Sequence, residues 1–216
     1  MARSRFPDPM LAPADAPLAI GGDLEPETLL DAYSHGIFPW PDGSGWLTWW
    51  SPDPRAVFDV GGVHVSRSLR RTLASGRLRC TLDTAFKAVL TGCAERPGEG
   101  TWITPEMAEA YLRLHHLGFA HSVEVWQADR LVGGVYGVAL GAAFMGESMF
   151  HRERDASKVA LAHLDLRLAA AGYELIDAQL PTPHLESLGA VAVPRALFLR
   201  RLAAALRTRP RPLQPT

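Results

Sequence analysis

The stretch AHSVEVWQADRLVGGVYGVALGAAFMGESMF, residues 120–150, decides the fold. Two largely apolar runs lie on either side of Ala128-Asp129-Arg130, and a short polar turn between two such runs predicts a β-hairpin. Residues 142–150 follow directly and predict a third strand. The uncharged part, residues 131–146, has 16 residues and five glycines. A membrane-spanning helix needs about 20 residues and disfavours glycine, so we predict paired strands here.

The segments around this stretch predict helices and further short strands. We expect helices from the cap Ser66 to Gly76, from the cap Asp83 through Leu90, from the cap Thr104 with Pro105 to Gly118, over residues 155–172 as an amphipathic helix, and over residues 194–207. Short strands are expected at 78–82 and 173–179. Four or five strands with interleaved helices predict an α+β fold with a mixed β-sheet flanked by helices.

The N-terminal part differs in composition, being rich in Pro, Trp and Gly. Glu25-Pro26-Glu27 opens a predicted helix that ends at Gly36. The segment GIFPWPDGSGWLTWWSPDPR, residues 36–55, contains four tryptophans, which we expect mostly in a small core. Its prolines predict that no regular element forms there. We therefore expect a small N-terminal domain over residues 1–60, a larger domain over 61–207 and a Pro/Arg tail over 208–216.

Length and composition exclude several classes of protein. The chain has 216 residues, of which 47% are hydrophobic and 21% charged, so it is neither a disordered chain nor a coiled coil. Cys80 and Cys93 lie in no CxxC motif, which disfavours a zinc site. One disulfide is possible, but two largely buried free thiols are favoured. The N-terminus lacks the apolar stretch of a signal peptide, so a cytoplasmic location is expected.

Charge is divided unevenly along the chain. Residues 1–60 carry nine acidic and three basic side chains, whereas residues 61–216 carry fourteen acidic and nineteen basic ones. Twenty of the 22 basic residues are Arg, which can hold phosphates with two parallel hydrogen bonds. A GC-rich genome that uses Arg in place of Lys would produce the same composition. Modest basicity alone therefore does not establish nucleic-acid binding.

Several familiar catalytic motifs are missing from the sequence. There is no GxxxxGK[ST] loop, no GxGxxG and no GxSxG. His115 and His116 are adjacent, so on a helix they point apart and cannot chelate one ion together. ATP-driven and metal-driven chemistry therefore lack support in the sequence.

Polar residues inside apolar strands are the remaining candidates for chemistry. The two-residue period of YELIDAQ puts Asp177 and Gln179 on one face of the strand. Glu147 lies among apolar residues in AAFMGESMF, where a carboxylate needs partners or a shifted pKa. Both acids could instead simply tie a strand to a loop, an interpretation that is slightly favoured on these residues alone. Phe144 and Met149 could line an apolar pocket, although core packing is the default for such residues.

Together the motifs resemble those of a known family. FPWPDGSGWLTWWSPDPRAV, TWITPEM, AHSVEVW, LVGGVYGV, FMGESMF, the Ser157-Lys158 pair, IDAQ and HLESLGA occur in the order and spacing of the bacterial leucyl/phenylalanyl-tRNA–protein transferases. The resemblance runs from about Phe6 to Leu202. Each motif alone is weakly specific, but eight in order are strongly specific.

The resemblance implies a reaction and a fold. Members of the family move Leu, Phe and, less well, Met from aminoacyl-tRNA to the N-terminal Arg or Lys of a protein. The new peptide bond creates an N-degron, which marks the protein for degradation. The family has a small N-terminal domain and a larger domain similar to the GNAT acetyltransferases. It needs no cofactor, neither ATP nor a metal, and we expect a monomer without membrane contact.

The resemblance also implies roles for individual residues. Asp177 would orient Gln179, which would contact the attacking amine or relay its proton, and Glu147 would hold the amino group of the donor. The other implied sites are an aminoacyl pocket of Val135, Phe144, Ser148, Met149 and Leu164, a platform for the 3′ adenosine of tRNA at Trp40, Trp102 and Tyr33, and phosphate contacts at Arg67, Arg70 and Arg71. Val135 stands where some relatives have Met, so the pocket shape is expected to differ from theirs.

Two other functions remain as alternatives. An acyl-CoA-dependent N-acetyltransferase would need a glycine-rich turn whose amides bind pyrophosphate at a helix start. The residues before the expected helix at 155 read FHRERDASK and contain no glycine. A module that binds basic N-termini without catalysis is the second alternative, which the acidic N-terminal region permits and the set of Glu147, Asp177 and Gln179 disfavours.

Overall fold

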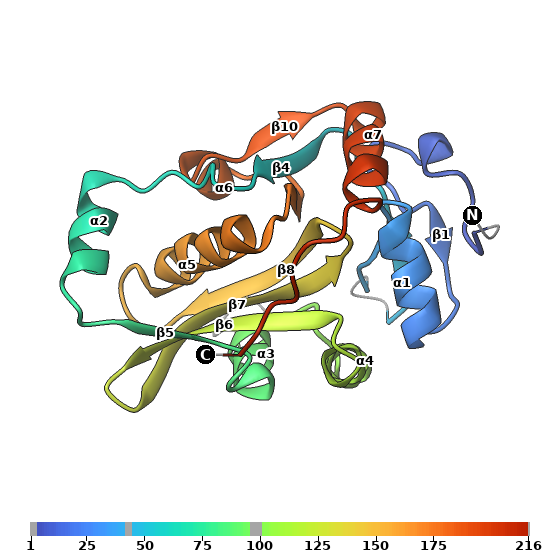
Figure 1. Cartoon of the computed structure of the whole chain (residues 1–216). Coiled ribbons are helices and arrows are strands. Elements are labelled where there is room, and N and C mark those ends of the chain that lie inside the picture. Colours follow the sequence, from blue (N-terminus) through green and yellow to red (C-terminus); the bar gives the residue numbers. More distant parts are fainter. Residues whose placement is uncertain (1–3, 42–44, 96–100, 216) are drawn as a thin grey trace.

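A seven-stranded mixed β-sheet forms the centre of the computed structural model, which describes residues 4–41, 45–95 and 101–215. Its strands are β4 (Arg55–Asp59), β5 (Arg79–Leu82), β6 (Ala120–Gln127), β7 (Arg130–Leu140), β8 (Ala143–His151), β9 (Leu175–Gln179) and β10 (Val191–Val193). They lie in the order β10-β4-β9-β8-β7-β6-β5, as Figure 1 shows for most of the sheet. Neighbours are antiparallel except for the parallel pair β8 and β9.

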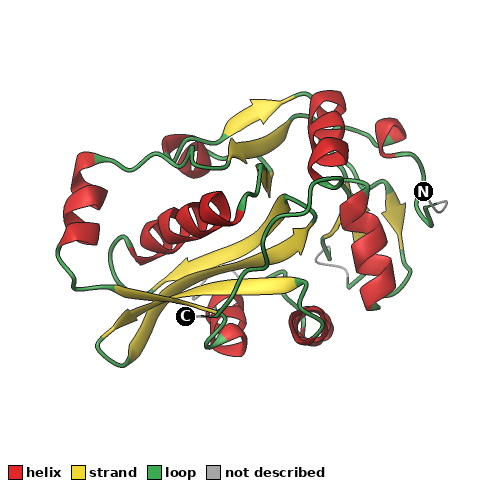
Figure 2. Cartoon of the chain, viewed as in Figure 1, coloured by secondary structure: helices red, strands yellow, loops and turns green. Residues whose placement is uncertain are grey.

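Helices cover both faces of this sheet (Figures 1 and 2). They are α2 (Arg67–Ala74), α3 (Phe86–Ala94), α4 (Pro105–His116), α5 (Ala156–Ala171), α6 (Pro183–Ser187) and α7 (Arg195–Ala205). The helix α5 packs across β6, β7 and β8 on one face, and α3 and α4 pack on the other. The apolar core is accordingly divided into two clusters, one on each side of the sheet. The predicted fold class, α+β with a mixed sheet flanked by helices, is confirmed.

The hairpin expected from residues 120–150 is confirmed. β6 and β7 pair antiparallel across the turn, with a shift in register between Val125 and Trp126, and Ala128 in the turn adopts a left-handed conformation with φ +51°. β8 then pairs antiparallel with β7, as the continuous apolar pattern predicts. These three strands form the part of the sheet against which α3 and α5 pack.

Two of the three predicted helix caps are confirmed and one is wrong. Ser66 and Thr104 each accept a hydrogen bond from the backbone N–H three residues later, which is the geometry of an N-cap. Asp83 does not cap α3, whose N-cap position is Ala85. The carboxylate of Asp83 instead accepts a hydrogen bond from the Ser122 N–H, at 2.8 Å, because β5 ends beside β6 at this point.

The amphipathic pattern expected for residues 155–172 is only partly present. In the first half of α5 the residues at 156, 157, 159, 160, 161 and 162 are all buried, so no continuous polar face remains. The reason is that the helix lies between the sheet on one side and the segment around α2 on the other. Only the second half, where Leu166 and Ala169 are exposed, has a solvent side.

The N-terminal segment contains regular structure that its prolines do not predict. The short strands β1 (Ala19–Ile20), β2 (Phe38–Pro39) and β3 (Thr48–Trp50) form a small sheet in the order β1-β3-β2, beside α1 (Pro26–Ser34) and the 3-10 helix Pro9–Leu11. Pro39 has no backbone N–H to donate. It is tolerated because β2 is an edge strand, which pairs with a neighbour on one side only. Trp49 is buried, Trp40 and Trp50 are half-buried, and Trp46 is 63% exposed.

The strands β4 and β10 were not predicted, so the sheet has more strands than the expected four or five. β4 precedes the proposed domain boundary at residue 61 and yet belongs to the large sheet. A boundary between β3 and β4 would leave the sheet intact, and we propose it in place of residue 61.

The C-terminal segment folds back onto α5 rather than extending into solvent. The Arg211 N–H donates to the carbonyl of Ala171 at 2.8 Å, and Leu213 is 9% exposed. Cys80 is half-buried and Cys93 buried, and neither forms a disulfide bond. Among the residues with described positions, no helix is long and apolar enough to cross a membrane.

Candidate active site

A cleft of about 950 Å³ opens beside β8, β9 and the first turns of α5. Glu147, Asp177 and Gln179, the three polar residues singled out from the sequence, all line it. β8 and β9 are parallel neighbours, with Met145 opposite Asp177. This pairing brings Glu147 and Asp177, which are 30 positions apart in the chain, to the same part of the cleft. The rest of the lining comes from β4, β7, the end of α3, α5 and the α6 region.

Asp177 is completely buried and accepts three hydrogen bonds. Arg55 forms a bidentate ion pair with it, with Nε donating to Oδ1 at 2.8 Å and Nη2 donating to Oδ2 at 2.6 Å. Oδ1 also accepts the backbone N–H of Gln179 at 2.9 Å. The carboxylate therefore holds the backbone of the residue two positions later in the chain.

Gln179 ends β9 in a left-handed conformation, with φ +63°. A β-bulge lies here, since Ala56 faces Gln179 while Val57 faces Asp177. The side chain of Gln179 reaches across to β8, where its Nε2 donates to Glu147 Oε1 at 2.8 Å. The two-residue alternation expected from YELIDAQ breaks down at the bulge, and Ala178 lines the cleft as well.

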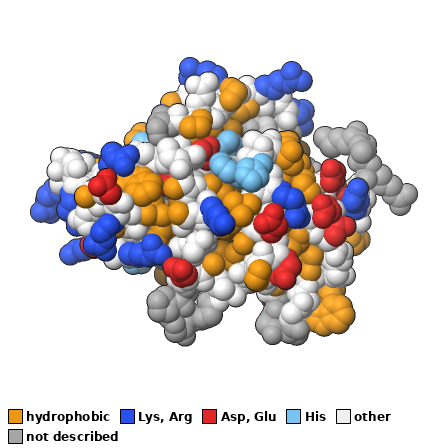
Figure 3. All heavy atoms as spheres, turned by 90° about the horizontal axis from the view of Figure 1, so that it is seen from below, with side chains coloured by type: hydrophobic (Ala, Val, Ile, Leu, Met, Phe, Trp, Pro, Cys, Tyr) orange, Lys and Arg blue, Asp and Glu red, His pale blue; other side chains and the backbone are white. Residues whose placement is uncertain are grey.

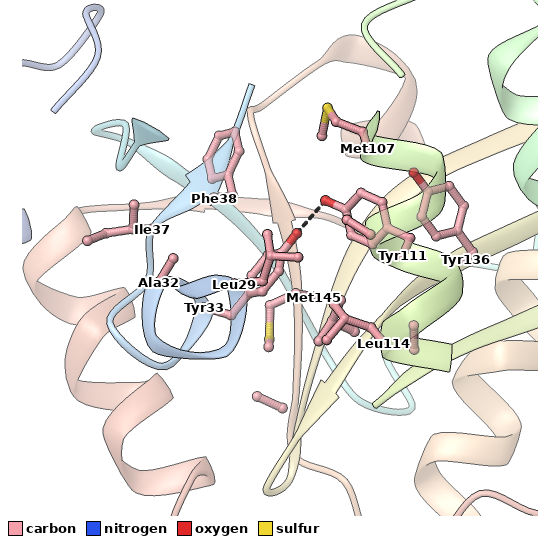
Figure 4. Packing of buried hydrophobic residues seen from close by; sticks show 14 of the residues in the cluster. Leu29, Ala32, Tyr33, Ile37, Phe38, Met107, Tyr111, Leu114, Tyr136 and Met145 are labelled. Carbon is pink, nitrogen blue, oxygen red and sulfur yellow. Dashed lines mark hydrogen bonds between the residues drawn. The ribbon is translucent and has the colours of Figure 1, made fainter. Parts of the chain in front are cut away.

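Glu147 is 8% exposed and is bonded from two sides. Besides Gln179, the hydroxyl of Tyr111 donates to its Oε2 at 2.6 Å, and the hydroxyls of Tyr33 and Tyr111 are 2.6 Å apart (Figure 4). Burial raises the pKa of Glu147 to about 7, assisted by the negative charge of Asp177 and opposed by the hydrogen bonds from the two tyrosines and Gln179. Burial, together with the charge of Glu147, also raises the pKa of Tyr33 and Tyr111 well above the usual value.

Arg55 and Tyr111 are site residues that sequence reasoning missed. Tyr111 lies on the buried face of α4 with Met107 and Leu114, so its helical spacing predicts only core. Arg55 begins an apolar run within the motif WWSPDPRAV, and a charge at that place was the available signal. Its partner Asp177 is 122 positions away, which local patterns do not reveal.

Four of the five residues assigned to an aminoacyl pocket line the cleft. They are Val135, Ser148, Met149 and Leu164. Phe144 is not among the lining residues, and its part in an aminoacyl pocket stays a prediction. Its ring is fully buried and lies over Gly137 of β7, in the space that a side chain would otherwise fill.

The residues assigned to the tRNA 3′ adenosine are not part of the cleft lining. Tyr33 is 1% exposed and its hydroxyl is bonded to that of Tyr111, so its ring has no free face for a base in this structure. Trp40 is half-buried, with its ring centroid 5.8 Å from that of Trp50. Trp102 is half-buried and, like Trp40, packs against the core cluster on the α3 and α4 side of the sheet. Stacking of a base on either tryptophan stays a prediction.

Arg67, Arg70 and Arg71 are exposed on α2 and stand outside the cleft lining. In Figure 3, Lys and Arg side chains gather at the left edge of the molecule, the side on which α2 and β5 lie in Figure 1, while Asp and Glu gather toward the right. The uneven charge of the sequence thus appears as an uneven surface. Whether these three arginines meet phosphate stays a prediction.

A metal centre has no counterpart in the described part of the chain, where no group of three or more His, Cys, Asp or Glu side chains is arranged to hold an ion. His121 Nδ1 lies 2.6 Å from Asp83 Oδ2, and the ring of His115 stacks on Phe86 at 4.2 Å. These histidines join β6 and α4 to their neighbours.

Comparison with known proteins gives consistent matches over most of the chain. The family model described as leucyl/phenylalanyl-tRNA protein transferase matches residues 57–203, and the model of that family's N-terminal domain matches residues 22–53. A leucyl/phenylalanyl-tRNA–protein transferase from Anaeromyxobacter dehalogenans (strain 2CP-C) is 59% identical over 204 residues, 93% of this chain and 88% of the relative. One of the same name from Shewanella baltica (strain OS155) is 53% identical over 98% of this chain and 90% of the relative.

Similarity to solved structures is much weaker. A GCN5-related N-acetyltransferase from Kribbella flavida has a TM-score of 0.43 and 11% identity, covering 77% of this chain and 60% of that one. A conserved protein of unknown function from Staphylococcus epidermidis has a TM-score of 0.45 and 9% identity, covering 82% and 68%. Scores at this level carry no functional inference.

Proposed function

Since the chain belongs to the leucyl/phenylalanyl-tRNA–protein transferase family, we propose that its cleft joins Leu or Phe, and less well Met, from aminoacyl-tRNA to the N-terminal Arg or Lys of an acceptor protein. The observation that carries this proposal is the hydrogen-bonded chain of Asp177, Gln179 and Glu147 at the end of a partly apolar cleft. The product is an acceptor with a new N-terminal residue, which acts as an N-degron.

The reaction needs little from the protein beyond positioning. An aminoacyl ester is already activated, so the acceptor's α-amine attacks the ester carbonyl once it has lost a proton. A peptide bond forms, the ester bond to the terminal ribose breaks, and the ribose oxygen receives a proton. Orientation of the amine and stabilisation of the developing charge supply most of the rate in reactions of this kind.

The polar end of the cleft suits these requirements. Gln179 donates its amide N–H to Glu147, which leaves the amide oxygen as the atom that can accept a hydrogen bond from the attacking amine. Glu147 has a pKa of about 7, so near neutral pH it is partly ionised and can hold the donor's ammonium group. Asp177 acts one step further away, as the anchor of the Gln179 backbone.

The apolar end of the cleft supports selection of the amino acid by size. Val135, Met149 and Leu164 line it, with Leu161 and Ile176 beside them. A pocket of this kind discriminates by about 1–3 kcal/mol per methylene, so Met is expected to be accepted less well rather than excluded. Val135 is smaller than Met, which would leave more room for the ring of Phe.

Several partner assignments belong to the same proposal. The 3′ adenosine would stack on Trp40 or Trp102, and the acceptor-stem phosphates would meet Arg67, Arg70 and Arg71 on α2. We propose a monomer that works in the cytoplasm, where aminoacyl-tRNA is made. The basic first residue of the acceptor would approach the acidic end of the cleft.

A transfer assay tests the proposal. Purified protein is mixed with radiolabelled Leu-tRNA or Phe-tRNA and a peptide that begins with Arg, without ATP or CoA, and a peptide that begins with Ala is the control. Label on the Arg peptide alone is the expected result. The Gln179→Ala variant should lose transfer, while Gln127→Ala, at the far end of β6, should keep it.

Two outcomes would overturn the proposal. Label on neither peptide, with an active relative as positive control, would mean that the chain has another reaction. Transfer of an acetyl group from labelled acetyl-CoA under the same conditions would favour the N-acetyltransferase alternative.

A further inference from the structure

Arg55 is a buried cation that contacts Asp177 of the proposed active site without lining the cleft itself. It begins β4 and is 1% exposed. Both of its contacts with Asp177 are within hydrogen-bond distance, and they form the fork that a guanidinium makes with a carboxylate. Burying two charges is costly, so such a pair needs a reason beyond stability.

The guanidinium of Arg55 is clamped between two aromatic rings. Its central carbon lies 4.8 Å from the ring centre of Phe38 in β2 and 4.5 Å from that of Phe198 in α7. The two rings come from opposite ends of the chain, so the N-terminal sheet and the last helix both fix the plane of the guanidinium. A lysine has the same charge but neither the fork nor the flat surface.

Arg55 and Gln179 donate hydrogen bonds to the same carboxylate oxygen of Asp177. Asp177 Oδ1 accepts Nε of Arg55 at 2.8 Å and the backbone N–H of Gln179 at 2.9 Å. Gln179 has φ +63°, a left-handed backbone conformation that is uncommon for residues other than Gly, Asn and Asp unless other contacts stabilise it. The hydrogen bond to Asp177 supplies this support, and with it the amide of Gln179 points at Glu147.

We propose that Arg55 is a positioning residue for the transfer reaction: through Asp177 it holds the backbone of Gln179 in the conformation that directs the Gln179 amide into the cleft. The inference rests on the proposed function, because it assigns Gln179 to the reaction. Asp177 is then an anchor, since its Oδ1 accepts from both Arg55 and Gln179 and its Oδ2 accepts from Arg55.

The first test is the Arg55→Lys variant, which keeps the charge and removes the fork. We expect kcat to fall by about 10- to 100-fold, with the KM for aminoacyl-tRNA nearly unchanged, because misplacement of a group near the reacting atoms affects mainly the chemical step. Hydrogen exchange of the Gln179 amide should become faster. This second readout does not depend on activity, so it still tests the inference if the transfer reaction itself is not observed.

The matched control is Arg195→Lys. Arg195 is also buried, at 6% exposure, but it donates to the backbone carbonyls of Ala12 and Ser51, away from the cleft lining. We expect this variant to lower the melting temperature while kcat and Gln179 exchange stay close to wild type. Equal losses of kcat in both variants would mean that Arg55 serves stability alone, which overturns the inference.

The route through Asp177 is tested by combining substitutions. If Arg55 acts only through Asp177, adding Arg55→Lys to an Asp177→Asn variant should lower kcat little further, because coupled groups are not additive. A full, independent loss in the double variant would overturn the route.

A charge-free pair keeps the test decisive if Arg55→Lys does not fold. Replacing both partners of a buried ion pair by apolar residues commonly preserves stability, so Arg55→Met with Asp177→Leu is expected to fold. Its kcat should be low and its Gln179 amide poorly protected from exchange. A folded double variant with wild-type kcat would overturn the inference.

Discussion

Glu147 is a buried carboxylate bonded to Gln179 and Tyr111. Burial raises its pKa from 4.5 to about 7 in the folded chain. Between these two values the folded protein keeps a proton that the unfolded chain has lost, so the free energy of unfolding falls as pH rises through this window. The loss amounts to about 3 kcal/mol at most, and it is complete above pH 7.

The Glu147→Gln variant tests this pH dependence. Gln cannot ionise, so its free energy of unfolding should fall less than that of the wild type between pH 4.5 and 7.5. Urea unfolding at several pH values measures the difference. Parallel curves for the two proteins would show that Glu147 is already ionised at pH 5 and that its burial has no such effect.

Asp177 and Gln179 are expected to differ when each is changed to Ala. The roles that the family resemblance implies predict a lower rate for both variants. For Asp177 we also expect a loss of stability of about 3–5 kcal/mol, because its removal leaves Arg55 buried without its partner. Gln179→Ala keeps the backbone N–H bond to Asp177 and loses one side-chain bond, at a cost of about 1 kcal/mol.

Thermal and urea unfolding of the two variants check this contrast, alongside the transfer rate of Gln179→Ala. Equal stability of Asp177→Ala and wild type would contradict the buried pair. An unchanged transfer rate for Gln179→Ala would contradict its part in catalysis.

At the scale of the element, β7 depends on a glycine where it passes β8. A Cβ atom at Gly137 would clash with the carbonyl oxygen of Met145 and would lie 2.5 Å from the ring of Phe144. A bulge between Tyr136 and Gly137 brings the two strands this close. Neither the backbone carbonyl nor the buried ring can move away freely, so β7 accepts only glycine here.

Gly137→Ala is therefore expected to lower the free energy of unfolding by about 2 kcal/mol or more. Gly146→Ala on β8 is the matched control, because its Cβ would meet only the carbonyl oxygen of Asp177, at an ordinary 3.5 Å. Urea unfolding of both variants measures the difference. Equal stability of the two would contradict the close approach of β7 and β8.

At the scale of the whole molecule, α2 and the last helix lie at opposite ends of the large sheet (Figure 1). Both ends carry exposed arginines, namely Arg67, Arg70 and Arg71 at α2 and Arg200, Arg207 and Arg209 in and after α7. Only the first set is proposed to meet tRNA. We compare two variants, each with the three arginines of one end changed to Ala. Both lose the same positive charge, so a difference between them reports a local contact with tRNA rather than net charge.

The change at α2 should make tRNA binding weaker and less dependent on salt. Each lost phosphate contact reduces the slope of log affinity against log salt by about 0.7–0.9, so three contacts correspond to about 2–3. Binding measured between 50 and 200 mM salt gives the slope, with the change at the α7 end as control. Equal slopes for the two triple variants would assign the effect to net charge alone.

What the sequence by itself determined are the features that rest on neighbouring residues. The hairpin of β6 and β7 follows from two strand-forming runs on either side of a short polar turn, and Ser66 and Thr104 act within one turn of their own helices. Eight motifs in order, from about Phe6 to Leu202, were enough to indicate the family. The hairpin and the two helix caps are each complete within a short window of the chain.

Tertiary structure alone decided the features that need distant partners. Arg55 meets Asp177 from 122 positions away, and Tyr111 meets Glu147 from 36. Asp83 is drawn to β6 rather than to α3, β4 and β10 become strands by pairing within the large sheet, and Phe144 packs on Gly137 instead of facing the cleft. In every case the free energy comes from burial and hydrogen bonds across the fold, which no local pattern records.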